Sequence, residues 1–354
     1  MTTAPASHEM TDWLEAAARE LGLAALGCLP TIAVCGDAEA LAARYAAWQA
    51  AGNAGLLPYL ERSLAARTEP LTARPWARSV LVFAFPHAWD LPGTIPDLPA
   101  PAAGAPAGVI SRYANGTDYH MAARPLLAGL LQRLETCLGH SVRHEGGADA
   151  WAVPDRYLAR RAGLGVIGRN QLLHVPGRGC RLFLAGLFVD AALPAAAWPG
   201  LADSATALPP TCDGCGRCLA ACPTGALRPA GGLHLAPCRS YLTMEYRGAL
   251  DAQQQVWLGD SLFGCDACSS ACPPMLEIPG QRVDLEWLLT IPAADLRRRL
   301  HGTPLAHAGP TLLKRNAAAI LGHHPGPEPR RLLAHVATTT GSAVIRDTIA
   351  ATAR

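Results

Sequence analysis

Eight cysteines between residues 212 and 273, grouped in two runs, constrain this chain more than any other feature of its sequence. The first run reads Cys212-x2-Cys215-x2-Cys218-x3-Cys222-Pro223, and the second reads Cys238, then Cys265-x2-Cys268-x3-Cys272-Pro273. In bacterial ferredoxins, three cysteines of such a run hold one 4Fe–4S cluster and the fourth reaches the other cluster. Zinc also takes paired C-x2-C ligands, and eight cysteines would serve two zinc sites. Zinc motifs rarely combine a four-cysteine run with a second Cys-Pro step, so the sequence predicts two 4Fe–4S clusters.

The crossed ligation of bacterial ferredoxins assigns these cysteines to two sets. The first cluster is expected on Cys212, Cys215, Cys218 and Cys272. The second is expected on Cys222, Cys238, Cys265 and Cys268. The other four cysteines stand in apolar context and are expected to be ordinary buried residues: Cys28, Cys35, Cys137 and Cys180. A chain with two clusters is predicted to be an electron-transfer protein or a reductase.

The composition indicates a folded protein of two or three domains that resides in a reducing compartment. The chain has 354 residues, of which 50% are hydrophobic and 16% charged, which favours a sizeable packed core. No secretory signal precedes the first helix, and no apolar run reaches the length of a membrane span. Without an export signal, so many cysteines favour metal ligation over disulfides. We therefore expect a cytoplasmic protein with no membrane contact.

Positive charge gathers at the end of the chain. From residue 291 to 354 there are nine Lys and Arg residues against three acids, a balance of +6, although the whole chain carries only +2. Such a basic tail is either a solvated helical surface or a surface for a phosphate-rich partner. Five of these cations are expected to hold phosphates in the second case: Arg297, Arg298, Arg299, Lys314 and Arg315.

Hydrophobic periodicity predicts helices and strands that alternate along the first 200 residues, and mostly helices after Asp284. Apolar, β-rich runs predict buried strands at 79–85 and 182–189. Amphipathic patterns predict helices at 13–21, 38–51 and 119–138, the first two ended by Gly22 and Gly52. Segments rich in Pro, Ala and Gly predict connections at 91–108 and 191–210. The fold class expected is α+β.

Several motifs in order along the chain resemble the epoxyqueuosine reductase family. The opening helices are similar around Trp48-Gln49-Ala50-Ala51-Gly52 and Pro58-Tyr59-Leu60. The central motifs are Arg112-Tyr113-Ala114-Asn115-Gly116-Thr117-Asp118-Tyr119-His120 and Ala162-Gly163-Leu164-Gly165-Val166-Ile167-Gly168-Arg169-Asn170. The cysteine region adds Cys238-Arg239-Ser240-Tyr241-Leu242-Thr243-Met244-Glu245 and Gly264-Cys265-Asp266-Ala267-Cys268, and the tail adds Leu312-Leu313-Lys314-Arg315-Asn316-Ala317.

This resemblance implies a fold, a pair of cofactor types and a reaction. Residues 1–205 would form a nitroreductase-like cobalamin-binding domain, 206–282 a ferredoxin-like module with two 4Fe–4S clusters, and 283–354 a HEAT-like helical tail. Electrons from a donor that the sequence does not identify would pass through the clusters to cobalamin. The enzyme, an oxidoreductase of queuosine biosynthesis and tRNA processing, would reduce epoxyqueuosine to queuosine in a tRNA anticodon stem-loop.

The resemblance also assigns roles to single residues. The family's proton donor, an Asp in a D-x-A-P-x-x-E-R segment, corresponds to Asp149, because the Asp and the Arg of that segment are in register here. As a general acid it would protonate the departing oxygen, and burial against the corrin would raise its pKa. The residues expected to contact cobalamin are Tyr119, Arg156, Ser240 and Asp266. Without the resemblance, these would be a loop acid, a core tyrosine, a surface arginine and residues of a cluster loop.

Three departures from the family's motifs bear on the substrate. Val166 replaces a Trp, Arg169 replaces a Lys, and Pro273-Pro274-Met275 replaces P-W-N after the last cysteine. Arg169 keeps the charge but not the geometry of Lys. Two other functions therefore stay open: a cobalamin-dependent iron–sulfur reductase of a small molecule, similar to a dehalogenase, and a ferredoxin-type electron carrier.

Overall fold

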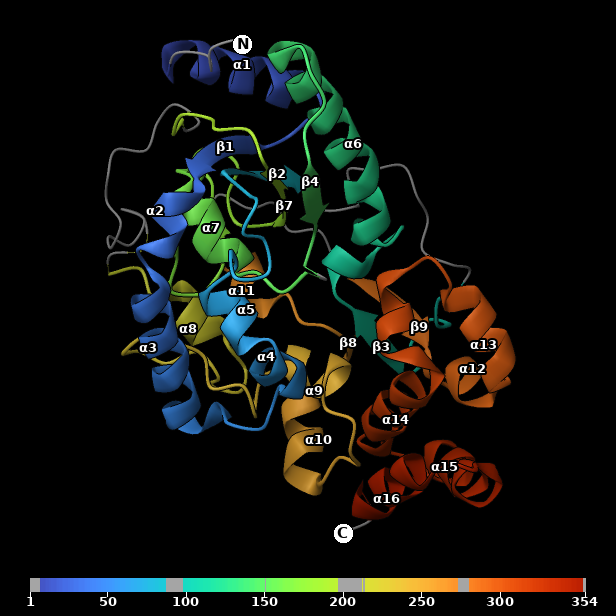
Figure 1. Ribbon diagram of the computed structural model, residues 1–354. Coiled ribbons are helices and arrows are strands. Elements are labelled where there is room, and N and C mark those ends of the chain that lie inside the picture. The colour runs from blue at the N-terminus through green and yellow to red at the C-terminus, as the bar shows by residue number, and fades with distance from the viewer. Residues whose placement is uncertain are drawn as a thin grey trace.

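The fold is described from a computed structural model that covers residues 7–86, 98–149, 151–196, 212, 214–272 and 280–352. Figure 1 shows the N-terminal sheet and its helices in the upper part of the molecule and the C-terminal helices at the lower right. A smaller sheet lies between these two regions. None of the helices in the described ranges combines the length and apolar character needed to cross a bilayer. The mixture of helices and sheets agrees with the predicted class.

The N-terminal sheet has four antiparallel strands in the order β1-β2-β7-β4. Their bounds are Ala25–Pro30 for β1, Ser79–Pro86 for β2, His144–Gly147 for β4 and Leu182–Val189 for β7. Strands β2 and β7 confirm the two strand predictions. Strands β1 and β4 were not predicted, because β1 is short and Gly-containing and β4 is largely exposed.

Both faces of this sheet are covered, which explains the unbroken apolar sequence of β2. Leu81, Phe83 and Phe85 share a core with α1 (Ser7–Glu20) and α6 (Tyr119–Leu138) on one face. The alternate residues of the strand share a second core with α7 (Asp155–Arg161) on the other face. Successive strand residues point to opposite faces, so a strand buried on both sides needs apolar residues throughout.

Short helices connect β1 to β2 and extend down one side of the molecule (Figure 1). They are α2 (Thr31–Cys35), α3 (Ala38–Trp48), a π-helical turn η1 (Gln49–Asn53), α4 (Pro58–Arg62) and α5 (Leu64–Thr68). The predicted stop at Gly52 is confirmed, since this residue has a φ of 91° that interrupts the helical backbone. Two further short elements, β5 (Val166–Ile167) and β6 (Leu173–His174), form a small hairpin.

The second sheet joins distant parts of the chain in the order β8-β3-β9. Its strands are β3 (Ala107–Ile110), β8 (Ser261–Phe263) and β9 (Gln281–Asp284). The loop predicted at 91–108 therefore ends in a strand, whereas its first part, 91–97, lies outside the described residues. Because β3 precedes the cysteine region but pairs within it, the boundaries expected near residues 205 and 282 stay predictions.

The cysteine region and the tail share one hydrophobic core. The helices of the cysteine region are α8 (Arg217–Ala221), α9 (Arg239–Met244), α10 (Ala252–Leu258) and α11 (Ala267–Ser270). Those of the tail are α12 (Leu285–Thr290), α13 (Ala293–Leu300), the 3-10 turn η5 (Pro304–His307), α14 (Gly309–Gly322), α15 (Pro327–Thr339) and α16 (Ala343–Thr352). Helix α14 lies against β8, α12 and α16, at the centre of this core.

Two of the five tail cations expected to bind phosphates are engaged inside the protein, so the expectation was wrong for them. Arg315 is fully buried and donates hydrogen bonds to the carbonyls of Leu242, Tyr246 and Gly248. Lys314 donates to the carbonyls of Leu289 and Ile291. The charge of these residues is visible in the sequence, but it does not show that Arg315 is bound by the cysteine region and Lys314 by the end of α12.

Candidate active site and cluster sites

Four of the eight cysteines line one small, enclosed cavity of about 20 Å³. They are Cys212, Cys215, Cys218 and Cys272. Helix α8 begins after Cys215 and contains Cys218, α11 ends just before Cys272, and these two helices lie in contact. Arg169, Asn170 and His174 line the same cavity from the β5–β6 hairpin. Thiols drawn from both runs thus converge on one space, as crossed ligation requires.

The other four cysteines form a second group with its own mutual interactions. Burial raises the pKa of the Cys268 thiol, and the charges of Cys265, Cys238 and Cys222 raise it further. Burial likewise raises the pKa of Cys238, where Cys222 adds a repulsive charge. Like charges act at this strength only when the groups are close. The structure therefore brings Cys222 from the first run beside three cysteines of the second.

The four cysteines outside these groups were expected to be ordinary buried residues, and the structure confirms this for only some of them. Cys28 is buried in the sheet as expected, but Cys137 on α6 is exposed, so the expectation was wrong for it. Cys180 is buried, yet it lies beside the Cys272 thiol rather than among apolar neighbours alone. The side chain of Cys35 lies outside the described residues.

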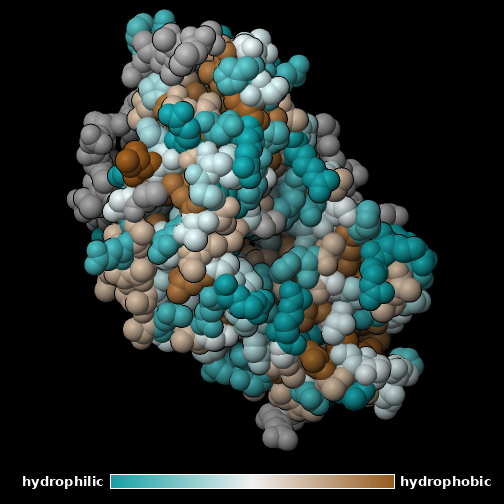
Figure 2. Space-filling view, viewed as in Figure 1, coloured by the Kyte–Doolittle hydropathy of each residue, from teal (hydrophilic) through white to brown (hydrophobic). Residues whose placement is uncertain are grey.

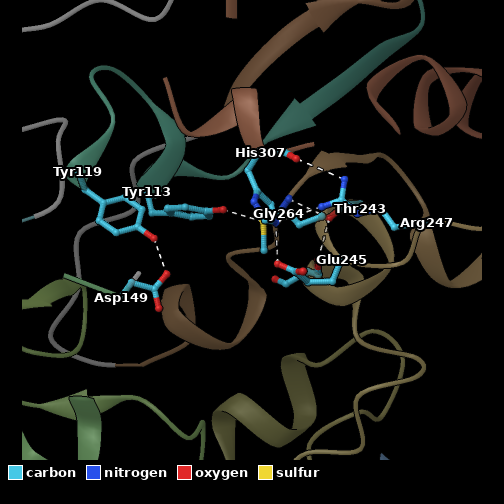
Figure 3. Close-up of polar contacts among 10 residues, drawn as sticks. Tyr113, Tyr119, Asp149, Thr243, Glu245, Arg247, Gly264 and His307 are labelled. Atoms are coloured by element: carbon cyan, nitrogen blue, oxygen red, sulfur yellow. Dashed lines mark hydrogen bonds and ion pairs between the residues drawn. The ribbon is translucent and has the colours of Figure 1, made fainter. Parts of the chain in front are cut away.

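Asp149 and Tyr119, two of the predicted site residues, meet directly. Asp149 follows β4 in a loop with a left-handed backbone (φ 55°), and its carboxylate accepts a 2.6 Å hydrogen bond from the Tyr119 hydroxyl (Figure 3). Tyr119 begins α6, where the carboxylate of Asp118 caps the helix. Its ring stacks on Phe183 of β7 at 4.4 Å. The sheet and the helix together therefore hold the phenol that orients Asp149.

The surroundings of this pair affect its two members differently. Burial raises the pKa of Tyr119, and the neighbouring Asp149 charge raises it further, so the phenol keeps its proton. Asp149 itself is exposed in the chain. The burial expected for it therefore depends on a bound ligand that covers the loop.

Asp155, six residues after Asp149, is the carboxyl group that the fold itself buries. Its Oδ1 accepts a 2.6 Å hydrogen bond from the indole N–H of Trp151. Burial raises its pKa to about 7, and the Asp149 charge adds to this effect. Trp151 packs over Gly186 of β7, where a Cβ would lie 2.7 Å from the indole ring. A small residue on the strand thus makes room for the tryptophan that contacts Asp155.

The raised pKa predicts how Asp155 affects stability. An exposed carboxyl in the unfolded chain ionises near pH 4, whereas Asp155 in the folded chain keeps its proton until about pH 7. The folded state therefore binds more protons between these values, and its stability falls as the pH rises through them. Asp155→Asn should raise the melting temperature more at pH 8 than at pH 4.5, measured by circular dichroism. An equal shift at both values would contradict the buried acid.

The remaining predicted contacts with cobalamin bind protein groups in the chain. The carboxylate of Asp266 accepts hydrogen bonds from the Ser111 hydroxyl at 2.6 Å and from the Arg112 amide at 2.9 Å. Burial raises the pKa of the Cys238 thiol, and a hydrogen bond from Ser240, in the first turn of α9, offsets part of this rise. Arg156 donates to the carbonyl of Gln171. Asp266 thus fastens the second cysteine run to the segment that leads to Tyr119.

Three residues near Asp149 were not predicted as site residues from the sequence: Tyr59, Tyr113 and Glu245. Burial raises the pKa of Tyr59 to about 12, and the charges of Glu245 and Asp149 raise it as well. Glu245 follows α9 and pairs with His307 at 2.9 Å, and the Tyr113 hydroxyl contacts the Met244 sulfur (Figure 3). All three stand in motifs that carried the family resemblance, which was the available signal.

Figure 2 shows the surface hollowed between the N-terminal part and the C-terminal helices.

Two segments of the chain match known protein families. Residues 211–274 match the family described as 4Fe-4S double cluster binding domain. Residues 67–150 match the family described as Epoxyqueuosine reductase QueG, DUF1730. The first match contains all eight cysteines of the two runs, and the second ends immediately after Asp149.

Individual relatives extend the similarity over most of the chain. The epoxyqueuosine reductase of Burkholderia pseudomallei is 31% identical, over 89% of this chain and 81% of that protein. The enzyme of the same name from Pseudomonas aeruginosa is also 31% identical, over 91% of this chain and 87% of that protein. A crystal structure of epoxyqueuosine reductase with a tRNA-Tyr epoxyqueuosine-modified tRNA stem loop shares the fold, with a TM-score of 0.78 and 24% identity over 98% of this chain and 89% of that one. This chain therefore belongs to the epoxyqueuosine reductase family.

Proposed function

We propose that this chain reduces epoxyqueuosine to queuosine in the anticodon stem-loop of a tRNA, with electrons that pass through two 4Fe–4S clusters to cobalamin. The observation that carries this proposal is the 2.6 Å hydrogen bond from the Tyr119 hydroxyl to Asp149, in a chain whose cysteines converge in two groups. We describe residues 1–205 as a nitroreductase-like domain, 206–282 as a ferredoxin-like module and 283–354 as a HEAT-like tail.

The cysteine groups fit two clusters. A 4Fe–4S cluster needs four thiolates, one for each iron, and the cavity presents four thiols beside Arg169, Asn170, His174 and Arg217. We assign the first cluster to Cys212, Cys215, Cys218 and Cys272. We assign the second to Cys222, Cys238, Cys265 and Cys268. The positive charges of Arg169 and Arg217 at the first cavity suit a cluster that carries net negative charge.

The residues around Asp149 fit a bound corrinoid. A corrin ring presents a broad apolar face with amide groups at its rim, and aromatic rings with polar ends match such a surface. Tyr59, which is 45% exposed, offers such a ring, and Tyr119, Arg156 and Ser240 offer polar groups. Asp266 contributes indirectly, because its hydrogen bonds position the chain that leads to Tyr119. The family uses cobalamin, which supplies, when bound, the reduced metal centre of the reaction, while the clusters supply the electrons.

The residues of the chain perform the proton chemistry. Conversion of an epoxide to an alkene consumes two electrons and two protons and releases the oxygen as water. Asp149 donates a proton to the departing oxygen, a role usually worth about 10²–10⁴ in rate. The Tyr119 hydroxyl holds the Asp149 carboxyl through Oδ2, and its raised pKa keeps it a hydrogen-bond donor throughout. A ligand that covers the exposed loop excludes water and favours the protonated acid.

The decisive experiment is single-turnover conversion of an epoxyqueuosine-containing tRNA stem-loop by protein that carries both clusters and cobalamin. Conversion should require cobalamin, and the protein should contain about eight irons and eight sulfides per chain. Full activity after exhaustive removal of cobalamin would overturn the proposal. A chain that binds both cofactors but leaves the stem-loop unchanged would instead be a reductase of a small molecule.

One of the departures from the family's motifs, Arg169, lies at the cavity of the first cluster. Arg169 lines the cysteine cavity and donates a hydrogen bond to the carbonyl of Pro229, so its guanidinium faces the cluster site. Val166 is half-buried in β5. Pro273, Pro274 and Met275 lie outside the described residues. Arg169, one of the two described departures, lines a cluster cavity rather than the Asp149 loop, which favours the family's substrate over a different one.

The exposed arginines of α13 are proposed to contact the tRNA backbone. Arg297, Arg298 and Arg299 are exposed, and hydrophilic side chains gather over this helix at the right of Figure 2. Replacement of the three by Gln should weaken tRNA binding and flatten its salt dependence by roughly one unit of slope per lost phosphate contact. Filter binding across a salt series measures both. Arg19→Gln on α1, far from this helix in Figure 1, is the control and should leave the slope unchanged.

The same triple variant separates two kinds of surface. An unchanged slope would mean that the α13 arginines are a solvated face, with Arg298 paired with Asp295 at 2.6 Å and Arg299 placed over Trp287.

We propose a cytoplasmic location, because tRNA is modified there and cluster thiolates need a reducing compartment. The electron donor is a further protein or small reductant that the sequence does not identify.

A further inference from the structure

A histidine and two cysteines converge at one edge of the first cysteine cavity. The Nδ1 atom of His174 and the Sγ atoms of Cys180 and Cys272 all lie within 4.8 Å of one another. The His174 Nδ1 and the Cys272 Sγ are 3.7 Å apart. Ligand atoms held about 2.0–2.3 Å from a tetrahedral zinc stand roughly 3.5 Å from each other. The three atoms therefore have nearly the spacing that one metal ion imposes.

Hydrogen bonds determine the tautomer of His174, and with it which ring nitrogen presents a lone pair to the thiols. The side-chain oxygen of Asn170 accepts from the Leu172 amide at 3.2 Å, which sets the orientation of the Asn170 amide. The same oxygen lies 3.0 Å from the His174 Nε2, so that nitrogen must carry the hydrogen. In the neutral ring, Nδ1 then presents a lone pair toward Cys272. Metal-binding histidines are oriented in this way, by a hydrogen bond from the other ring nitrogen.

Asn170 also holds the second thiol, and the surrounding backbone leaves space for the ring. Its side-chain nitrogen lies 3.6 Å from the Cys180 Sγ, to which it donates. Asn170, His174 and Cys180 are 5%, 8% and 4% exposed, so water does not compete for these contacts. A Cβ on Gly168 would lie 2.4 Å from the His174 Nε2. The β5–β6 hairpin is thus shaped around the imidazole.

We propose that His174, Cys180 and Cys272 form a mononuclear site for a soft divalent ion, Zn²⁺ or Fe²⁺, which shares the Cys272 thiolate with the first cluster. Imidazole and thiolate together suit these ions. Three protein ligands leave the fourth position open, as in catalytic rather than structural zinc sites. The site takes no part in the cobalamin chemistry. It rests on the proposed cluster ligands in one respect, that Cys272 also binds the first cluster.

The experiment uses full-length protein that carries both clusters, prepared without oxygen and without cobalamin, with Zn²⁺ as the probe. After removal of weakly held metal with a chelator, the wild-type chain should keep about one zinc beside its eight irons. Zinc-edge X-ray absorption should show two sulfur ligands near 2.3 Å and nitrogen near 2.0 Å. This edge reports the zinc alone, since the iron of the clusters absorbs elsewhere.

Two variants and one control decide the outcome. His174→Ala and Cys180→Ser should each lose the zinc while they keep the iron of both clusters. Cys28→Ser, which changes an equally buried cysteine away from the site, should keep both metals. Zinc absent from the iron-replete wild type, or zinc that persists in both site variants, would refute the site. Activity on tRNA is not the readout, so failure here and failure of the proposed reaction are distinguishable.

Discussion

Asp149→Asn is expected to turn over at least about 10²-fold more slowly than the wild type, because the amide keeps the size of the side chain but has no acidic proton. The Tyr119 hydroxyl can still donate to the Asn oxygen, so the loop should stay in place. Both clusters, cobalamin binding and tRNA binding should be retained. The measurement is single-turnover conversion of the epoxyqueuosine stem-loop by chemically reduced enzyme.

Asp155→Asn is the matched comparison, since Asp155 is the rival proton donor. Its pKa of about 7 leaves about half of the molecules protonated at neutral pH, but its carboxyl packs against Trp151 rather than at the open loop. This variant should therefore lose much less activity than Asp149→Asn. Wild-type turnover in Asp149→Asn would remove Asp149 from the mechanism. Equal losses in the two variants would show that proton delivery does not depend on Asp149 alone.

Cys272→Ala is expected to lose the first cluster and nearly all turnover, although this cysteine lies 54 residues after Cys218 in the chain. The thiol completes the cavity lined by Cys212, Cys215 and Cys218. The iron content should fall from about eight to about four per chain, because each cluster holds four irons. Cluster-specific EPR signals in the reduced protein identify which cluster remains.

Cys222→Ala is the matched partner of this variant. The two possible ligand assignments, crossed between the runs or confined to each run, differ only in which cluster Cys222 and Cys272 bind. Crossed ligation predicts that Cys222→Ala removes the second cluster and that Cys272→Ala removes the first. Ligation within each run predicts the reverse. Identical EPR signals from the residual cluster in both variants would contradict either pairing, whereas the reverse assignment would contradict only the crossed one.

The sequence predicted the parts of this protein that depend on local pattern. The ferredoxin-type spacing and the order of motifs identified the family, and strands such as β2, buried on both faces, are apolar throughout and easily recognised. Strand β3 was missed because its pairing partners lie more than 150 residues later. The Tyr119–Asp149 contact joins two motifs that the sequence could name but not place in space.

Charged and reactive residues were the least predictable from sequence, because their roles depend on tertiary contacts. Arg315 counted as a surface cation but is fully buried against three carbonyls. Asp155 and Asp149 stand six residues apart, yet the fold leaves the first half-buried against Trp151 and the second exposed. Cys180 carried no signal at all, since the atoms that give it a candidate role come from β6 and from the end of the second cysteine run.

The position of β3 determines when the molecule can become complete during synthesis. Ile110 pairs with Gln281, so the strand waits for roughly 170 further residues, which a ribosome adds in roughly 10–35 s. Until β8 is synthesised, β3 has both edges unpaired and is open to association with other chains. A fragment that begins after residue 205 would lack the middle strand of the β8-β3-β9 sheet. The cluster-bearing half is therefore expected to aggregate when expressed alone and to recover when residues 1–205 are supplied as a separate chain.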